Sequence, residues 1–588
     1  MNVLFPAVLA VTLGLEAAVL AGPPLPSAIP APIAANAEAS PMRHHFLPPT
    51  RVLWTSGEGV KNADGLLGRK PGQAVLSEPV PPLELRSSTN QVAGVLLDFG
   101  VEIQGYLELF TPMMPEQGKL RRVRVRLGES ASEAMAELGG RQNAGNDHAL
   151  RDQTVTLPWL GKKMVGPSGF RFARIDNLDP ELPVQLSQVR AVLQLRDLEY
   201  AGQFRCNDER LNRIWEVGAY TVHLNMQEYL WDGIKRDRLV WLGDMHPEVS
   251  TIHAVFGQND VVRRSLDLIR DVTPVTEWMN GISSYSMWWV ILHEDLWMHG
   301  GDRGYLESQQ TYLTALLRRL LTFVDDAGRE KLDGMRFLDW PTYENKRAVD
   351  EGLHAMLVLA LDSGARLTAV LGEAALSKEC EAMTSRLRQR VPESSGRKSP
   401  AALLALAEVR QAGEVAEQVL KKGGPTDLST FYGFYVLQAL AKAGQTDAAL
   451  EFIRTYWGGM LDMGATTFWE DFDLEWTKGS ARIDELPAAG RRDIHGDCGA
   501  HCYVGFRHSL CHGWASGPTA WLSQHVLGVQ PVEPGLRKVR VTPNLGSLQW
   551  AEGTYPTPHG PILVRHERRA TGRVESVVKT PPGVEVVP

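Results

Sequence analysis

The sequence is poor in cysteine, and this excludes one way of stabilising so long a chain. Five cysteines occur among 588 residues, at uneven spacing, so a disulfide-stapled scaffold is excluded. Apolar residues make up 44% of the chain and charged residues 22%, as in ordinary globular proteins. We therefore expect large buried cores, and the length predicts roughly three to five domains.

Blocks of positive charge, long apolar runs and internal repeats are also missing. The formal net charge is −8 and no Lys/Arg-rich block occurs, which argues against nucleic acid as a partner. Beyond residue 20 we find no apolar run of the roughly eighteen residues that a membrane span needs. Without a repeat of fixed period, a regular solenoid is the weaker prediction.

The N-terminal segment indicates export to the periplasm or the extracellular space. An apolar run from Val3 to Leu20 precedes a small-residue site at Ala34 to Ala37, which is typical of a signal peptide. No early Lys or Arg is present, and Glu16 interrupts the run. We expect residues 1–37 to be a processed leader.

The remaining pattern predicts a multidomain α+β protein. Short alternating segments between residues 38 and 200 predict an N-terminal β-sandwich; they include Val95 to Phe99, Tyr106 to Phe110, Val123 to Leu127, Phe170 to Ile175 and Val184 to Leu193. A helix capped by Asn207 or Asp208 then opens a helical region over residues 201–527. Its roughly ten to twelve helices are the number that closes a central (α/α)6 barrel. Strand signals return in residues 528–588 and predict a small C-terminal antiparallel β-domain.

Functional side chains are densest between Trp231 and Asp244. Gly233 and Gly243 interrupt the helical pattern and suggest a loop at a barrel mouth, where Asp232, Asp237 and Asp244 could face one cavity. In the alternative interpretation this is a solvated turn, in which Arg236 and Arg238 pair with the aspartates.

A second carboxylate cluster surrounds Glu470. Trp469 and Phe472 flank this residue, and loss of solvation between them is expected to raise its pKa, which suits proton transfer. A glutamate that pairs locally at a helix start is the alternative. Two carboxyl groups from distant parts of a chain, among tryptophans, are what glycoside hydrolysis needs.

Tryptophan is unusually frequent, with 16 copies, and most of them lie in the helical region. Their ring faces could stack on sugars, although core packing is the ordinary role of any single tryptophan. The candidate platforms are Trp241, Trp288, Trp289, Trp340 and Trp514.

The segment from His495 to His512 is rich in cysteine and histidine. Its spacings match no standard zinc pattern, so packed or cavity-lining side chains are expected here rather than a metal site or a disulfide.

Two motifs resemble the signatures of the α-L-rhamnosidases of glycoside hydrolase family 78. The run from Asp232 to Asp244 resembles their acidic signature, Asp-x4-Glu-x6-Asp, and Ala465 to Glu470 resembles Ala-Thr-Thr-x-Trp-Glu. Shorter matches extend over nearly the whole mature chain: Leu97 to Gly100, Phe170 to Phe172, Phe337 to Trp340, Ser509 to Gly513 and Pro534 to Leu536.

The resemblance implies an exo-acting, inverting glycosidase that needs no cofactor and no metal. It implies that Glu470 is the general base and that Asp237 is the general acid. Asp232 and Asp244 would hold sugar hydroxyls. The remaining residues expected at the sugar are Trp241, Trp289, Trp340 and His512.

One departure from the family pattern leaves alternatives open. Position 237 is Asp where the family has Glu, so either the pocket compensates or another carboxylate such as Glu248 donates the proton. The sugar could be another deoxyhexose, and a sugar-binding protein without turnover is the alternative function. A phosphorylase or lyase is disfavoured because no anion-binding Gly-rich loop accompanies the carboxylates. The aglycone, the linkage and the oligomeric state stay open.

Overall fold

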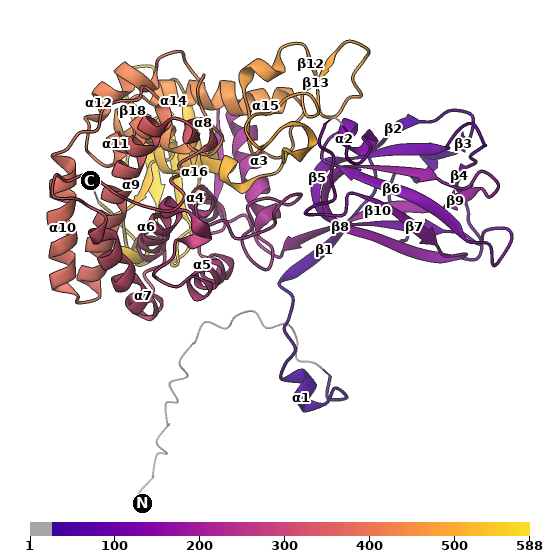
Figure 1. Cartoon of the computed structure of the whole chain (residues 1–588), viewed down its shortest axis with the longest axis horizontal. Coiled ribbons are helices and arrows are strands. Elements are labelled where there is room, and N and C mark those ends of the chain that lie inside the picture. The colour runs from indigo at the N-terminus through magenta and orange to yellow at the C-terminus, as the bar shows by residue number, and fades with distance from the viewer. Residues whose placement is uncertain (1–25, 141, 588) are drawn as a thin grey trace, which may run out of the picture.

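Two groups of elements lie side by side in the computed structural model, which describes residues 26–140 and 142–587 (Figure 1). N-terminal strands form one group, and the helices form the other, with the C-terminal strands on the helical side. The expected apolar signal run from Val3 to Leu20 lies outside the described residues. A single-turn helix, α1 (Ala31–Ala34), follows it and has no buried residue.

The N-terminal group consists of a seven-stranded and a three-stranded antiparallel sheet. The larger has the order β1-β10-β5-β8-β6-β7, with β2 also paired to β5, and the smaller has the order β3-β4-β9. Leu85 of the smaller sheet and Val95 of the larger belong to one shared core. The elements are β1 (Met42–Leu47), β2 (Arg51–Thr55), β3 (Val60–Lys61), η1 (Ala63–Leu66), β4 (Leu83–Leu85), β5 (Gly94–Thr111), β6 (Arg121–Gly128), α2 (Ala131–Met135), β7 (Asp152–Leu157), β8 (Gly161–Asn177), β9 (Val184–Leu186) and β10 (Gln188–Arg196).

Two of the predicted strands are one continuous strand. The segments predicted at Val95 to Phe99 and Tyr106 to Phe110 both belong to β5, whose pairing with β8 shifts register between Asp98 and Ile103. Gly100, with φ of 82°, lies in this shift and forms a bulge within the strand.

Helices make up most of residues 209–527, in the region where the sequence predicted them. Asp208 caps the first of them, because its carboxylate accepts hydrogen bonds from the backbone N–H groups of Arg210 (3.0 Å) and Leu211 (3.3 Å). The elements up to residue 462 are α3 (Glu209–Asn225), α4 (Met245–Val255), α5 (Asp260–Val272), η2 (Met279–Gly281), α6 (Ser283–Gly300), α7 (Arg303–Thr322), α8 (Trp340–Tyr343), α9 (Lys346–Val370), α10 (Ala374–Arg388), α11 (Lys398–Leu406), α12 (Ala412–Val415), η3 (Ala416–Leu420), α13 (Gly433–Lys442), α14 (Thr446–Phe452), η4 (Ile453–Trp457) and α15 (Gly458–Asp462). They are followed by η5 (Leu474–Thr477), β12 (Ser480–Ala481), β13 (Arg492–Asp493), η6 (Gly505–Arg507), η7 (Gly513–Ser516), α16 (Gly517–Trp521) and η8 (Leu522–Val526).

Helix α9 is long and apolar enough to cross a membrane by length and composition, which the sequence analysis did not expect. The most apolar window of this helix is 72% buried inside the protein. Its Leu353, Leu357 and Leu361 belong to the core that the helices share, so packing against other helices accounts for its apolar character.

The C-terminal strands differ from the expected antiparallel domain in two ways. Strand β11 (Gln203–Cys206), which precedes the first long helix, completes their sheet in the order β11-β16-β17-β18. Strands β15 and β19 pair in parallel. The elements are β14 (Val529–Pro531), η9 (Pro534–Leu536), β15 (Lys538–Val541), β16 (Trp550–Tyr555), β17 (Ile562–Arg568), β18 (Val574–Lys579) and β19 (Glu585–Val587).

The loop before α4 packs against the N-terminal sheets. Ile234 of this loop and Cys511 lie in the core of those sheets. Gly169 of β8 approaches the loop so closely that a Cβ there would lie 2.9 Å from the backbone nitrogen of Lys235. The sheets therefore fix the position of the aspartate-rich loop.

Candidate active site

A cavity of about 340 Å³ brings together most of the site residues predicted from the sequence. The cavity lies where helices begin, since Asp244 immediately precedes α4 and Ile282 immediately precedes α6. The predicted residues in its wall are Asp232, Asp237, Trp241, Asp244, Trp340, Glu470, His512 and the candidate platform Trp514. The others are Arg236, Asn280, Ile282, Tyr285, Met335, Phe337, Cys502, Tyr503 and Arg507.

A strained turn presents Asp237 to the cavity. Asp237 and Arg238 both have left-handed backbones, with φ of 57° and 58°, which costs non-glycine residues about 1 kcal/mol or more each. The turn is held by Asp232, whose Oδ1 accepts a hydrogen bond from the N–H of Leu239 (3.0 Å). Trp241 then donates from Nε1 to Asp237 Oδ2 (3.0 Å).

Arg236 lies between the two carboxylates to which the resemblance assigned catalysis. Its guanidinium donates to Asp237 Oδ1 (3.0 Å) and to Glu470 Oε1. Arg236 thus pairs with an aspartate, as the solvated-turn interpretation supposed, but it is buried and its second partner is Glu470. Arg238 instead donates to the carbonyl of Ile234 (2.9 Å).

The predicted rise in the pKa of Glu470 was wrong. Burial does favour the neutral acid, but the positive charges of Arg236 and His512 outweigh it and hold the pKa of Glu470 well below its ordinary value. The backbone N–H of Ser509 also donates to Glu470 Oε2 (3.2 Å). Glu470 is therefore an anion at neutral pH and can accept a proton.

His512 is the centre of a cluster of carboxyl groups. Its Nε2 lies 3.4 Å from Glu470 Oε1, 3.6 Å from Asp232 Oδ2 and 3.8 Å from Asp244 Oδ2. Burial would lower the pKa of His512, but the charges of Glu470, Asp244 and Asp232 raise it.

The pKa values of the two aspartates in this cluster are shifted in the opposite direction from that of Glu470. Burial raises the pKa of Asp244 to about 7 and that of Asp232 well above its ordinary value. Tyr285 donates its hydroxyl to Asp244 Oδ1 (2.9 Å). One cavity therefore holds an ionised carboxylate beside carboxyl groups that can carry a proton near neutral pH.

Aromatic rings form much of the remaining wall. Trp241 and Trp340 are half-buried, and Trp514 stacks on Phe431 with a centroid distance of 4.8 Å. Trp289 was predicted to contact the sugar, and this is corrected: it is fully buried on α6, and its ring lies against His293, with a centroid distance of 3.9 Å. Trp288 is absent from this wall as well and borders a different cavity.

Glu248, the alternative proton donor, does not line the cavity. It is fully buried on α4, and neither of its carboxyl oxygens has a hydrogen-bond partner. A Cβ at Gly513 would lie 1.5 Å from Glu248 Oε1, so the backbone at Gly513 covers this carboxyl group. Glu248 therefore has no direct access to a substrate in the cavity, and the alternative that it donates the proton is wrong.

The Cys/His-rich segment is held by hydrogen bonds. His495 pairs with Ser130 Oγ (2.7 Å) and with the carbonyl of His508 (2.9 Å), and all five cysteines are free. Glu129, Glu133 and His495 are close enough together to surround a metal ion. The Lys235 ammonium already lies 3.0 Å from Glu129 and 3.2 Å from Glu133, so this cluster has a cation of its own.

Comparisons with known proteins agree with this fold. Residues 199–394 match the domain family described as the bacterial alpha-L-rhamnosidase 6 hairpin glycosidase domain, and residues 528–587 match the bacterial alpha-L-rhamnosidase C-terminal domain. These two matched ranges are domains found in bacterial α-L-rhamnosidases. Asp232 to Asp244 lie within the first matched range, whereas Glu470 and His512 lie outside both.

The relatives that this chain matches are considerably longer. It is 26% identical to an α-L-rhamnosidase of an Alteromonas species (strain LOR), over 67% of this chain and 45% of the relative. It is 24% identical to one of Streptomyces avermitilis, over 89% of this chain and 51% of the relative. The chain thus spans about half the length of these relatives.

Solved structures show the same fold as this chain. A family 78 rhamnosidase of Bacillus sp. GL1 superposes with a TM-score of 0.70 at 23% identity, covering 86% of this chain and 54% of that one. A rhamnosidase of Klebsiella oxytoca with rhamnose bound gives a TM-score of 0.64 at 19% identity, covering 82% of this chain and 96% of that one. The chain therefore combines helices and sheets as these structures do.

The N-terminal sheets support the site, and no sequence pattern predicted this. Glu129 follows β6, and its carboxylate accepts hydrogen bonds from the N–H of Leu510 (2.6 Å) and from the hydroxyl of Ser509 (3.3 Å). Ser509 in turn donates to Glu470. Lys235 joins Glu129 to the carbonyl of His508 (2.7 Å). No local pattern around Glu129 signals these contacts, because its partners come from the helical part of the chain.

Proposed function

We propose that this chain is an exo-acting glycoside hydrolase that releases terminal α-L-rhamnose, or a related deoxyhexose, from glycans or glycosides with inversion. The observation that carries the proposal is that Glu470 and Asp237 face one cavity and contact the same guanidinium. An inverting reaction needs two carboxyl groups separated enough to admit a water, at about 6.5–9.5 Å. Arg236 lies between the two carboxyl groups and prevents their direct contact, which supports such a separation.

In the proposed reaction Glu470 takes a proton from water, whose oxygen attacks the anomeric carbon. The bond from that carbon to the glycosidic oxygen breaks, and the leaving oxygen receives a proton from the general acid. We assign the acid role to Asp237, whose side chain is 16% exposed at the cavity. Asp232 and Asp244 would bind sugar hydroxyls, with Trp241, Trp340 and His512 around the ring.

Asp244 is a second candidate for the general acid. Both carboxyl oxygens of Asp237 already accept hydrogen bonds, from Arg236 and Trp241. Asp244 carries a pKa of about 7 because it is buried, which suits donation near neutral pH. The two candidates are distinguished by how strongly the activity of the Asp237→Asn and Asp244→Asn variants depends on the leaving group.

The finer architecture belongs to the same proposal. We infer that the helices between residues 201 and 527 close an (α/α)6 barrel around the cavity and that the sheets of residues 38–200 form a β-sandwich. The six-hairpin family description supports the barrel. We also propose export, for which the apolar N-terminal run is the support.

Incubation with an aryl α-L-rhamnoside tests the proposed function. Nuclear magnetic resonance spectra recorded at once should show the released sugar first as its β-anomer, because one displacement inverts the configuration. The α-anomer as first product would contradict inversion, and the absence of released sugar would contradict the hydrolase.

A sugar-binding protein without turnover is the alternative function. The low pKa of Glu470 favours it, because a strongly stabilised anion is a weak base. Saturable binding of L-rhamnose without hydrolysis of any aryl α-L-rhamnoside would support this alternative.

A further inference from the structure

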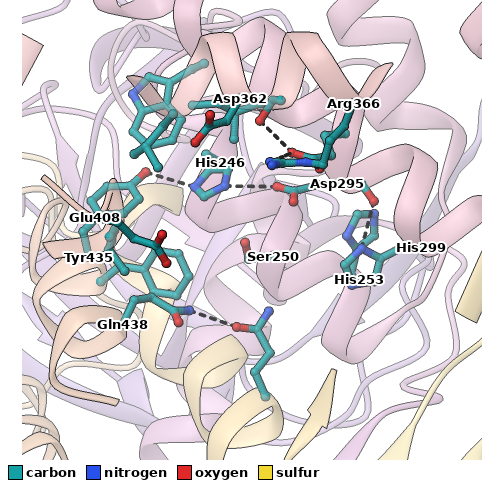
Figure 2. Close-up of a pocket in the computed structure, with 18 of the residues that line it drawn as sticks. His246, Ser250, His253, Asp295, His299, Asp362, Arg366, Glu408, Tyr435 and Gln438 are labelled. Carbon is teal, nitrogen blue, oxygen red and sulfur yellow. Dashed lines mark hydrogen bonds and ion pairs between the residues drawn. The ribbon is translucent and has the colours of Figure 1, made fainter. Parts of the chain in front are cut away.

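A second cavity, of about 460 Å³, lies farther along the same helices and shares no lining residue with the first. On α6 Tyr285 lines the first cavity and Asp295 the second, ten residues or about 15 Å along the helix axis. Asp244, directly before α4, borders the first cavity, whereas Ser250 and His253 on α4 border the second. Figure 2 shows the second cavity with Ser250 near its centre.

A layer of stacked rings lines the second cavity, and none of these rings lines the first. His246 stacks on Trp288 with a centroid distance of 4.6 Å, and Trp288 stacks on Tyr435 at 5.0 Å. The hydroxyl of Tyr435 lies 3.1 Å from His246 Nδ1, which holds the layer together. The second cavity is therefore a separate site and not an extension of the candidate active site.

The charged groups of this cavity are largely paired with one another (Figure 2). Arg366 makes a two-point contact with Glu294, and Arg388 makes one with Asp362. Both guanidiniums are thereby neutralised, so the cavity offers no free positive charge to an anion. Asp295 Oδ2 lies 3.0 Å from His246 Nε2, and its other oxygen has no hydrogen bond to a described side chain.

Uncharged donors and acceptors make up the rest of the polar wall. Gln438 and Gln524 are joined by one hydrogen bond (2.9 Å), in which Gln524 is the acceptor, so its amide N–H groups remain for another partner. Ser250 contributes a hydroxyl, and His253 Nδ1 is buried without any hydrogen-bond partner. The apolar part of the wall consists of Ile291, Leu359, Leu406 and Phe434.

We propose that this second cavity binds a neutral sugar ring without hydrolysing it. Each sugar hydroxyl can both donate and accept a hydrogen bond. The wall matches this, because its carboxylates accept hydrogen bonds, its amide groups donate and accept them, and apolar side chains lie beside both. A volume of about 460 Å³ is within the usual range for small-molecule sites. Among the described residues, the group placed to surround a metal ion is elsewhere, at Glu129, Glu133 and His495. Catalysis is not expected, because each carboxylate of the wall is already paired: Asp295 with His246, Glu294 with Arg366, Asp362 with Arg388 and Glu408 with Lys442.

Filling the cavity tests the proposal. Ser250→Trp places a large ring in the space, and the matched control Ser308→Trp adds the same ring at an exposed position of α7. Equilibrium dialysis with labelled L-rhamnose, D-glucose and D-galactose counts the sugars bound per chain. We expect one more bound sugar in the wild type and in Ser308→Trp than in Ser250→Trp, for at least one of the three probes. Equal counts in all three proteins for every probe would overturn the proposal.

Two further measurements keep the outcome clear. Gln524→Leu removes the amide without adding bulk, and it should weaken the same site about fivefold to tenfold, as the loss of one hydrogen bond does. Unchanged affinity in a folded Gln524→Leu protein would also contradict the proposal. Binding of choline in place of all three sugars, lost in Ser250→Trp, would assign the cavity to an organic cation. The test compares the number of sugars bound by each variant with the number bound by the wild type. It therefore applies whether or not the candidate active site also binds sugar.

Discussion

Replacing Arg236 by methionine tests whether this guanidinium keeps Glu470 ionised. Arg236 and Glu470 are both buried and in direct contact. At an effective dielectric constant of about 20, opposite charges about 4 Å apart attract by about 4 kcal/mol. Once the charge is removed, burial dominates and the pKa of Glu470 rises, although His512 still opposes this. The base is then lost as the pH falls, whereas the wild-type base stays ionised.

The assay is kcat/KM for an aryl α-L-rhamnoside between pH 5 and pH 8. Because one protonation costs at most tenfold per pH unit, the ratio of Arg236→Met to wild type should fall by up to about 100-fold between pH 7 and pH 5. Arg236→Lys should restore much of the loss at pH 5, because it returns a positive charge. Arg238→Met is the matched control, since Arg238 does not contact Glu470. A ratio that stays constant with pH would refute the electrostatic reasoning.

Three further outcomes are expected. Asp237→Asn should lose far more activity on an alkyl glycoside than on an aryl glycoside with a good leaving group; if Asp244→Asn shows this pattern instead, Asp244 is the acid. Glu129→Gln should lower the free energy of unfolding by about 2–3 kcal/mol in denaturant titrations, because the buried Lys235 loses one of its two carboxylates, and an unchanged midpoint would contradict the role of this pair. Trp340→Ala should raise KM about tenfold in a stable protein, whereas Trp289→Ala should destabilise the core by about 3–5 kcal/mol; the reverse would place Trp289 at the sugar.

Local sequence patterns predicted the elements well where a segment's own residues decide its structure. The alternation of β6 buries Val123 and Val125 and exposes Arg122, and Asp208 caps α3 through hydrogen bonds to residues two and three positions on. The bulge at Gly100 was missed, because a glycine between two apolar runs has the same pattern in a bulge and in a turn. The joining of β11 to the C-terminal sheet was missed because its partner β16 is hundreds of residues away.

The sequence predicted most of the residues that form the site, but it did not predict the electrostatic interactions between them. Motif resemblance brought Asp237 and Glu470 together, and both line the cavity. The direction of the pKa shift of Glu470 was wrong, because flanking aromatics are visible in the sequence whereas the contact with Arg236 exists only in the fold. Trp289 was misplaced for a similar reason: Trp288 and Trp289 are neighbours on α6 and point to different surroundings.

The central claim is that Glu470 is the base that activates water, and its conversion to glutamine tests this most directly. The change keeps the size of the side chain and removes the proton acceptor, so kcat for an aryl α-L-rhamnoside should fall by at least about 100-fold with little change in KM. Asp471→Asn, the neighbouring change outside the cavity, should retain most of the wild-type kcat. A Glu470→Gln protein whose kcat stays within a few fold of the wild type would contradict the account.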